Sequence, residues 1–85
     1  MKNSYLSIEV IDRTTFQRFL ELLLLDFKEN RMNWENDRIE LFLEAMASYT
    51  EDLDGYYQNN YPEIDPDNAT WRTFADILKG AVIYE

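Results

Sequence analysis

The 85-residue sequence contains no cysteine and no histidine. Without cysteine the protein can form neither disulfides nor cysteine zinc sites, and it has no thiolate nucleophile. The absence of cysteine fits a reducing compartment. Without histidine it lacks the side chain that most often acts as a general base near neutral pH, so a conventional hydrolase triad cannot be built. We therefore expect no enzyme activity, no cofactor and no metal, and no residue is a candidate for catalysis.

Basic residues and long apolar runs are also scarce. The 8 Lys and Arg face 17 Asp and Glu, which gives a formal charge of -9. Such a charge repels phosphate backbones and anionic lipids and favours basic or polar partners, although it also simply keeps a small protein soluble. The apolar run Leu22–Leu25 is far too short to span a membrane, and the first ten residues lack the apolar run of a signal peptide. We expect a cytoplasmic protein that binds neither nucleic acid nor membranes.

The chain has only two glycines and two prolines, so little in it interrupts helices. Apolar residues recur with helical spacing in three segments: about Thr14 to Glu29, Asn36 to Tyr57, and from Asn68 or Thr70 onward. The sequence predicts a mainly α, compact three-helix fold in a single domain, residues 1–85. We expect the last helix to continue past Gly80, and the alternative is a short strand pair formed by the two termini.

The apolar stripes of the three helices predict one shared core. Thr14 and Gln17 suggest a capping box for the first helix, and Asn36 suggests an N-cap for the second. Leu22 and Leu25 fall outside the stripe of the first helix. Either the N-terminal segment covers this helix on a second side, or the helix meets another chain. The second alternative would allow the protein to be a homo-oligomer. The predicted core consists of Phe16, Leu20, Leu23, Phe42, Met46, Leu53, Trp71, Phe74 and Leu78.

The stretch SYTEDLDGYYQNNYP, residues 48–62, combines acids, a glycine and four tyrosines. Because Leu53 and Tyr57 continue the apolar stripe, we expect the second helix to run unbroken through Gly55. Asp54 lies within the apolar arc, where an unpaired carboxylate is costly. We therefore predict a structural polar link in which Asp54 pairs with Arg72, with Lys79, a tyrosine hydroxyl or the start of the third helix as other partners.

The remaining residues at this helix end are candidates for binding a partner. Rigid aromatic rings beside charged side chains are typical of protein interfaces. The predicted binding residues are Glu51, Asp52, Gly55, Tyr56 and Tyr61.

Two acidic patterns have simpler interpretations. Glu40, Glu44 and Glu51 form a stripe along the second helix, which is usually a solvated face. The run EIDPDN, residues 63–68, lacks the glycine and glutamate positions of a calcium-binding EF-hand, so we interpret it as a turn-rich loop.

Several motifs resemble a family of small acidic bacterial proteins catalogued as a domain of unknown function. They are Trp34, FLEA at 42–45, DLDGYY at 52–57, Trp71, FADIL at 74–78 and IYE at 83–85, and the Lys79-Gly80 pair departs from the pattern. The resemblance covers residues 34–85 and implies a self-contained bacterial domain, with no activity attached. In size, acidity and helical content the chain is also similar to bacteriocin immunity proteins, without a shared motif.

These observations predict a non-enzymatic protein-binding module that uses the acidic, tyrosine-rich helix end. The alternative is an immunity-type inhibitor whose acids cover the basic site of a toxin or nuclease. A third class, an enzyme or small-molecule binder, would require a concave pocket lined by Trp34, Tyr57 or Trp71.

Overall fold

The computed structural model describes residues 4–84, which are mainly helical and compact, as predicted. The helices are α1 (Arg13–Asn30), the 3-10 helix η1 (Arg31–Asn33), α2 (Ile39–Glu51), α3 (Leu53–Asn60) and α4 (Trp71–Ile83). The described residues thus form four α-helices instead of the predicted three. No residue from 4 to 84 lies in a strand. The strand-pair alternative is wrong, because α4 continues through Gly80 to Ile83 as expected.

Local hydrogen bonds explain where α1 and α4 begin. The Asp12 carboxylate accepts from the Thr15 N–H at 2.8 Å, and the Thr15 hydroxyl oxygen accepts from the Asp12 N–H at 3.0 Å. This capping box satisfies N–H groups that have no partner within the helix, and it replaces the predicted Thr14–Gln17 box. Thr70, one of the two residues at which the last helix was expected to begin, caps α4, since its hydroxyl oxygen accepts from the Thr73 N–H.

Asn36 connects the start of α2 to the end of α4. It was predicted to cap α2, but Arg38 occupies that position. Asn36 is instead buried, and its side-chain amide donates to the carbonyls of Ala81 at 2.9 Å and Tyr84 at 2.6 Å. Carbonyls at a helix C-terminus lack partners within the helix, so this amide satisfies two of them and fixes α4 against the chain before α2.

The predicted second helix is divided at Asp52, three residues before Gly55. Asp52 has backbone angles of φ -92° and ψ 6°, and it separates α2 from α3. Its carboxylate accepts a hydrogen bond from the Tyr84 hydroxyl, so a contact with the end of the chain accompanies the bend. The helix does pass through Gly55, but the expectation of one unbroken helix is wrong, because periodicity is retained across a bend and cannot reveal it.

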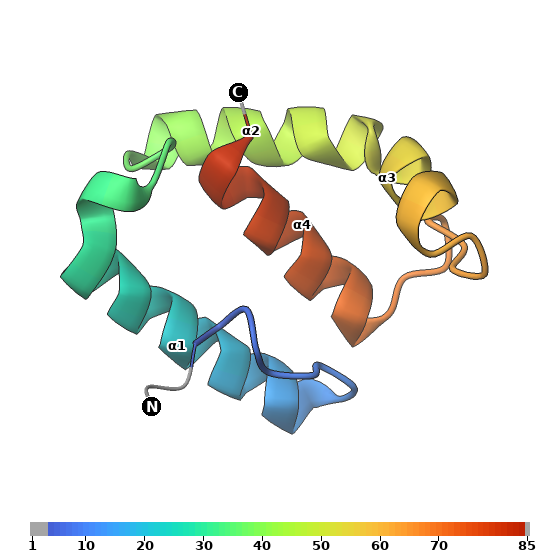
Figure 1. Ribbon diagram of the computed structural model, residues 1–85, viewed down its shortest axis with the longest axis horizontal. Coiled ribbons are helices and arrows are strands. Elements are labelled where there is room, and N and C mark those ends of the chain that lie inside the picture. Colours follow the sequence, from blue (N-terminus) through green and yellow to red (C-terminus); the bar gives the residue numbers. More distant parts are fainter. Residues whose placement is uncertain (1–3, 85) are drawn as a thin grey trace.

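The helices form a flat layer in which α4 lies between α1 and α2 (Figure 1). Figure 1 also shows the N-terminal segment crossing α1, and α3 turning away from the line of α2. The described chain measures 34 × 27 × 20 Å. Because α1, α4 and α2 lie side by side in this layer, each has faces that no other helix covers. Many apolar side chains therefore cannot be covered on both sides.

This thinness explains which predicted core residues are exposed. Of the predicted set, Leu23 and Leu53 are buried, and Phe16, Phe42, Met46 and Leu78 are partly buried. The prediction is wrong for Leu20, Trp71 and Phe74, which are exposed. The N-terminal segment supplies part of the core and covers Leu22, whereas Leu25 stays exposed. The main buried cluster consists of Tyr5, Val10, Phe19, Leu22, Leu23, Ala75 and Val82.

Candidate functional site

A buried polar link joins α3 to α4. Tyr57 is 1% exposed, and its hydroxyl donates to Asp76 Oδ2 at 2.8 Å. Asp76 is 7% exposed, and it also pairs with Arg72 Nε at 3.3 Å and Lys79 Nζ at 3.9 Å. These three partners compensate the cost of burying the carboxylate. The link fixes α3 beside the first half of α4.

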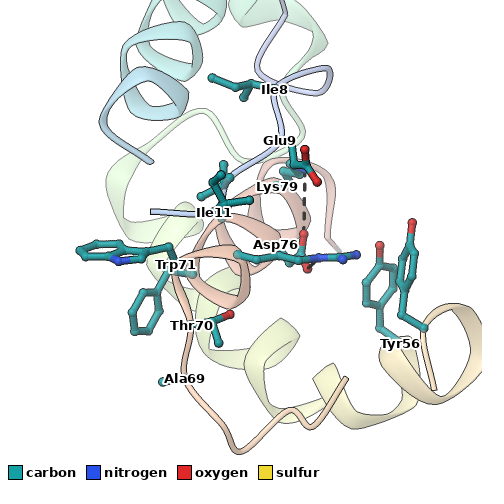
Figure 2. A pocket seen from close by; sticks show the side chains of 14 residues that line it. Ile8, Glu9, Ile11, Tyr56, Ala69, Thr70, Trp71, Asp76 and Lys79 are labelled. Atoms are coloured by element: carbon teal, nitrogen blue, oxygen red, sulfur yellow. Dashed lines mark hydrogen bonds and ion pairs between the residues drawn. The ribbon is translucent and has the colours of Figure 1, made fainter. Parts of the chain in front are cut away.

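A groove of about 740 Å³ lies beside this link, between the N-terminal segment, α3 and α4. In Figure 2, Asp76 and Lys79 lie between Trp71 on one side and Tyr56 on the other, and a dashed line marks their ion pair. We call this groove of about 740 Å³ the tyrosine groove. Its lining consists of residues 8–11, Tyr56, Tyr61, residues 69–72, residues 74–76 and Lys79.

The aromatic wall of the tyrosine groove is held together by ring contacts. The ring centroids of Tyr56 and Tyr61 are 6.3 Å apart, and the Arg72 guanidinium carbon lies 4.4 Å from the centroid of the Tyr61 ring. A guanidinium over an aromatic face is attracted by the ring quadrupole. Arg72 therefore connects the Asp76 link to the loop that follows α3.

The structure brings only part of the predicted binding set together. Tyr56 and Tyr61 both line the tyrosine groove. Gly55 is next to Tyr56 in α3, and a Cβ added to it would have no neighbour within 4 Å. Glu51 and Asp52 are exposed but do not line the groove. Asp52 is occupied in addition by the Tyr84 hydroxyl.

The predicted link between Asp54 and Arg72 is wrong. Asp54 is exposed, and its carboxylate accepts from the Gly55 N–H at 2.8 Å, within the first turn of α3. The bend at Asp52 changes the direction of the helix, so the wheel drawn for one straight helix misplaced this side chain. The acid that Arg72 holds is Asp76.

Asp76 is the residue of the site that the sequence reasoning missed. It lies four residues after Arg72 and three before Lys79, and both spacings place oppositely charged side chains together on a helix. It also stands inside the apolar run FADIL. Together these two signals could have identified it as a shielded acid. Tyr57, which was predicted to continue the apolar stripe, is the residue of α3 that hydrogen-bonds to Asp76.

The tyrosines around the link titrate at high pH. Burial, with smaller effects from Tyr56, Asp76 and Tyr84, raises the pKa of Tyr49 to about 12. Burial and the hydrogen bond to Asp76 raise the pKa of Tyr57, and burial with nearby Asp76 raises the pKa of Tyr56. Removing a proton from any of these hydroxyls would place a negative charge in a poorly solvated position.

The free energy of unfolding is therefore expected to fall as the pH rises above 10. The tyrosine pKa values are raised in the folded state, so the stability they contribute is complete below the ordinary tyrosine pKa of 10.0. It is lost as the pH rises from there through about 12, where Tyr49 releases its proton. Urea unfolding across this range tests the expectation, and Tyr49→Phe should make the decline less steep. A free energy that stays constant or rises would contradict it.

The described residues contain neither a metal-binding cluster nor a membrane-spanning helix. Among residues 4–84, no cluster of three or more acidic side chains has the geometry to hold a metal ion. None of the helices in the same range is both long and apolar enough to cross a membrane. Trp71 lines the tyrosine groove, so the concave pocket required by the small-molecule hypothesis is present.

Comparisons with known proteins identify a family for the chain. No curated protein and no solved structure matches it significantly. One family profile matches residues 12–85, and its description is a family of unknown function, DUF7660. The match extends the resemblance seen from residue 34 onward to include α1. The chain therefore belongs to the family of unknown function DUF7660.

Proposed function

We propose that this protein is a non-enzymatic protein-binding module and that a segment of its partner occupies the tyrosine groove. The observation that carries the proposal is the wall of Tyr56, Tyr61, Trp71 and Arg72 around one concave surface. Tyrosine, tryptophan and arginine are the residue types that contribute most to binding energy in protein interfaces, and they do so best in partly enclosed positions.

The charges of the groove indicate what an occupant should provide. Arg72 contacts Asp76 through Nε, and a guanidinium has five N–H donors in all, so further donors remain for a partner. Lys79 reaches the same carboxylate only at 3.9 Å. An occupant with a carboxylate or an exposed main-chain carbonyl would complete the hydrogen bonding of these two cations.

The helix end next to the groove supports charge selection on its rim. Glu51, Asp52 and Asp54 are exposed there, and Gly55 leaves a flat position between them and Tyr56. A partner that carries basic side chains beside its groove-binding segment would be attracted to this rim, which favours faster association.

The first test is affinity capture from the native host with three forms of the protein. Tyr61→Ala removes a groove ring and the stacking surface of Arg72, while Met32→Ala changes a fully exposed apolar side chain in η1. We expect the wild type and Met32→Ala to capture the same partner with equal affinity, and Tyr61→Ala to bind it about tenfold or more weakly. A folded Tyr61→Ala variant with unchanged affinity for that partner would refute the groove as the binding site.

An immunity-type inhibitor is the second candidate, and one observation favours it. Glu40, Glu44 and Glu51 are all exposed along α2, so they present a row of carboxylates outside the groove. This row would cover a basic site of a toxin, with association that slows steeply as salt is added. Replacing Glu40 and Glu44 with Gln should then reduce binding more than Tyr61→Ala does. A toxin gene beside the gene for this protein would favour this candidate, and its absence across many genomes would count against it.

A further inference from the structure

A second apolar surface lies away from the tyrosine groove, between α1 and the start of α2. Leu20 and Leu24 of α1 and Ile39 and Leu43 of α2 are all exposed, with exposed fractions of 40, 54, 73 and 54%. We call these four residues the leucine face. Leu20, Leu24 and Ile39 line a hollow of about 390 Å³. The partly buried rings of Phe27, Trp34 and Phe42 line the same hollow and form its floor.

The aromatic floor makes the leucine face a rigid surface. The ring centroids of Phe27 and Trp34 are 5.0 Å apart, and those of Trp34 and Phe42 are 5.9 Å apart. The indole N–H of Trp34 donates to Asp26 Oδ2 at 2.7 Å, which fixes the tryptophan further. Apolar patches of this kind on a small soluble chain mark sites of association.

The α1 side and the α2 side of the leucine face each carry an exposed charged side chain, and these two side chains are opposite in sign. On α1, Lys28 lies one turn after Leu24 and therefore on the same side of the helix. On α2, Glu40 lies one turn before Leu43. Lys28 and Glu40 are exposed, and none of the ion pairs among the described residues uses either of them. Among the exposed side chains that these ion pairs do not use, the α1 flank thus carries Lys28, and the α2 flank carries Glu40 beside Arg38, which lines the hollow.

We propose that a second copy of this chain covers the leucine face in a two-fold symmetric dimer. The connection through η1 brings the end of α1 and the start of α2 to the same end of the layer (Figure 1), and Lys28 and Glu40 are close to those two helix ends in the sequence. A two-fold axis that runs along the layer places α1 of each copy against α2 of the other. Leu20 and Leu24 then meet the other copy's Ile39 and Leu43, and each Lys28 faces a Glu40.

The two flanks explain why a second copy fits despite its charge of -9. Two such chains repel each other over most of their surfaces, but this arrangement opposes unlike charges at the contact. The surface of the described protein is 6209 Å². A standard interface takes about 800 Å² from each partner, roughly an eighth of that surface, and the broad side of a 34 × 27 Å layer can supply it.

Sedimentation equilibrium over a wide range of concentrations tests the dimer. The wild type is expected to dimerise, and Leu24→Glu to weaken dimerisation about tenfold or more. Leu25→Glu is the matched control, because it makes the same change at an exposed leucine on another side of the same helix. It should dimerise like the wild type. A wild type that stays monomeric at every concentration, or a Leu24→Glu variant that dimerises as tightly as the wild type, overturns the proposal.

A charge exchange tests the pairing of α1 with α2. Lys28→Glu and Glu40→Lys should each weaken the dimer, because each opposes like charges twice in a two-fold interface. The double variant should regain most of the lost affinity. Both side chains are exposed, and circular dichroism shows whether each variant is folded. A double variant that is as weak as the single variants overturns the proposed arrangement.

Discussion

Replacing Asp76 with alanine is expected to lower the free energy of unfolding by about 2 to 4 kcal/mol. The change leaves the buried Tyr57 hydroxyl without its acceptor and removes the carboxylate that holds Arg72 and Lys79. The loss should be smaller than for a fully buried ion pair, because both cations reach solvent. Urea unfolding followed by circular dichroism measures it.

Asp54→Ala is the matched control for this experiment. Asp54 was predicted to be the shielded acid, but it is exposed and accepts a hydrogen bond from the adjacent Gly55 N–H. Its removal should cost less than about 1 kcal/mol, as for an acid in the first turn of a helix. If Asp54→Ala destabilised the protein as much as Asp76→Ala, the assignment of the polar link would be wrong.

Gly80→Ala is expected to destabilise the protein by about 1 to 3 kcal/mol, whereas Gly55→Ala is expected to stabilise it by about 0.5 to 1 kcal/mol. Both glycines are inside helices, where alanine is otherwise preferred. A Cβ on Gly80 would lie 2.4 Å from two atoms of the Tyr49 ring, and that ring also contacts Tyr56 and Tyr84. A Cβ on Gly55 would meet open space.

The two glycine variants are compared in the same urea unfolding experiment. A second variant that combines Gly80→Ala with Tyr49→Ala removes the ring in the way, so the alanine at position 80 should cost little in that background. Gly80→Ala with wild-type stability would mean that α2 and α4 do not approach each other as closely as the structure indicates.

Helical periodicity was sufficient to predict the type of fold, both ends of α1 and the start of α4. The pattern from Thr14 to Glu29 corresponds to α1, and Thr70, one of the two expected starting points, caps α4. The tertiary positions of Tyr5 and Val10 could not be predicted, because Val10 alternates with Leu6 and Ile8 as in a strand and Tyr5 falls outside that alternation. The role of Gly80 was also hidden, because close approach of the Tyr49 ring depends on how two helices cross.

The candidate site could be predicted only in part. Tyr56 and Tyr61 were identified from composition, since aromatic rings beside acids are typical of interfaces. Arg72 was assigned the correct structural role with the wrong acid, because a straight helical wheel could not include the bend at Asp52. The other wall of the groove comes from residues 8–11, which have no helical periodicity to reveal where they lie.

Hydrogen exchange of the captured complex tests most directly whether the tyrosine groove holds the partner. Amide exchange is compared between the free protein and the complex, with the Tyr61→Ala variant as a control. If the partner occupies the groove, amide exchange should become slower on binding in residues 8–11, in α3 and in residues 69–72, which surround the groove. Protection confined to α1 and the outer side of α2, with residues 56–61 unchanged, would contradict this expectation.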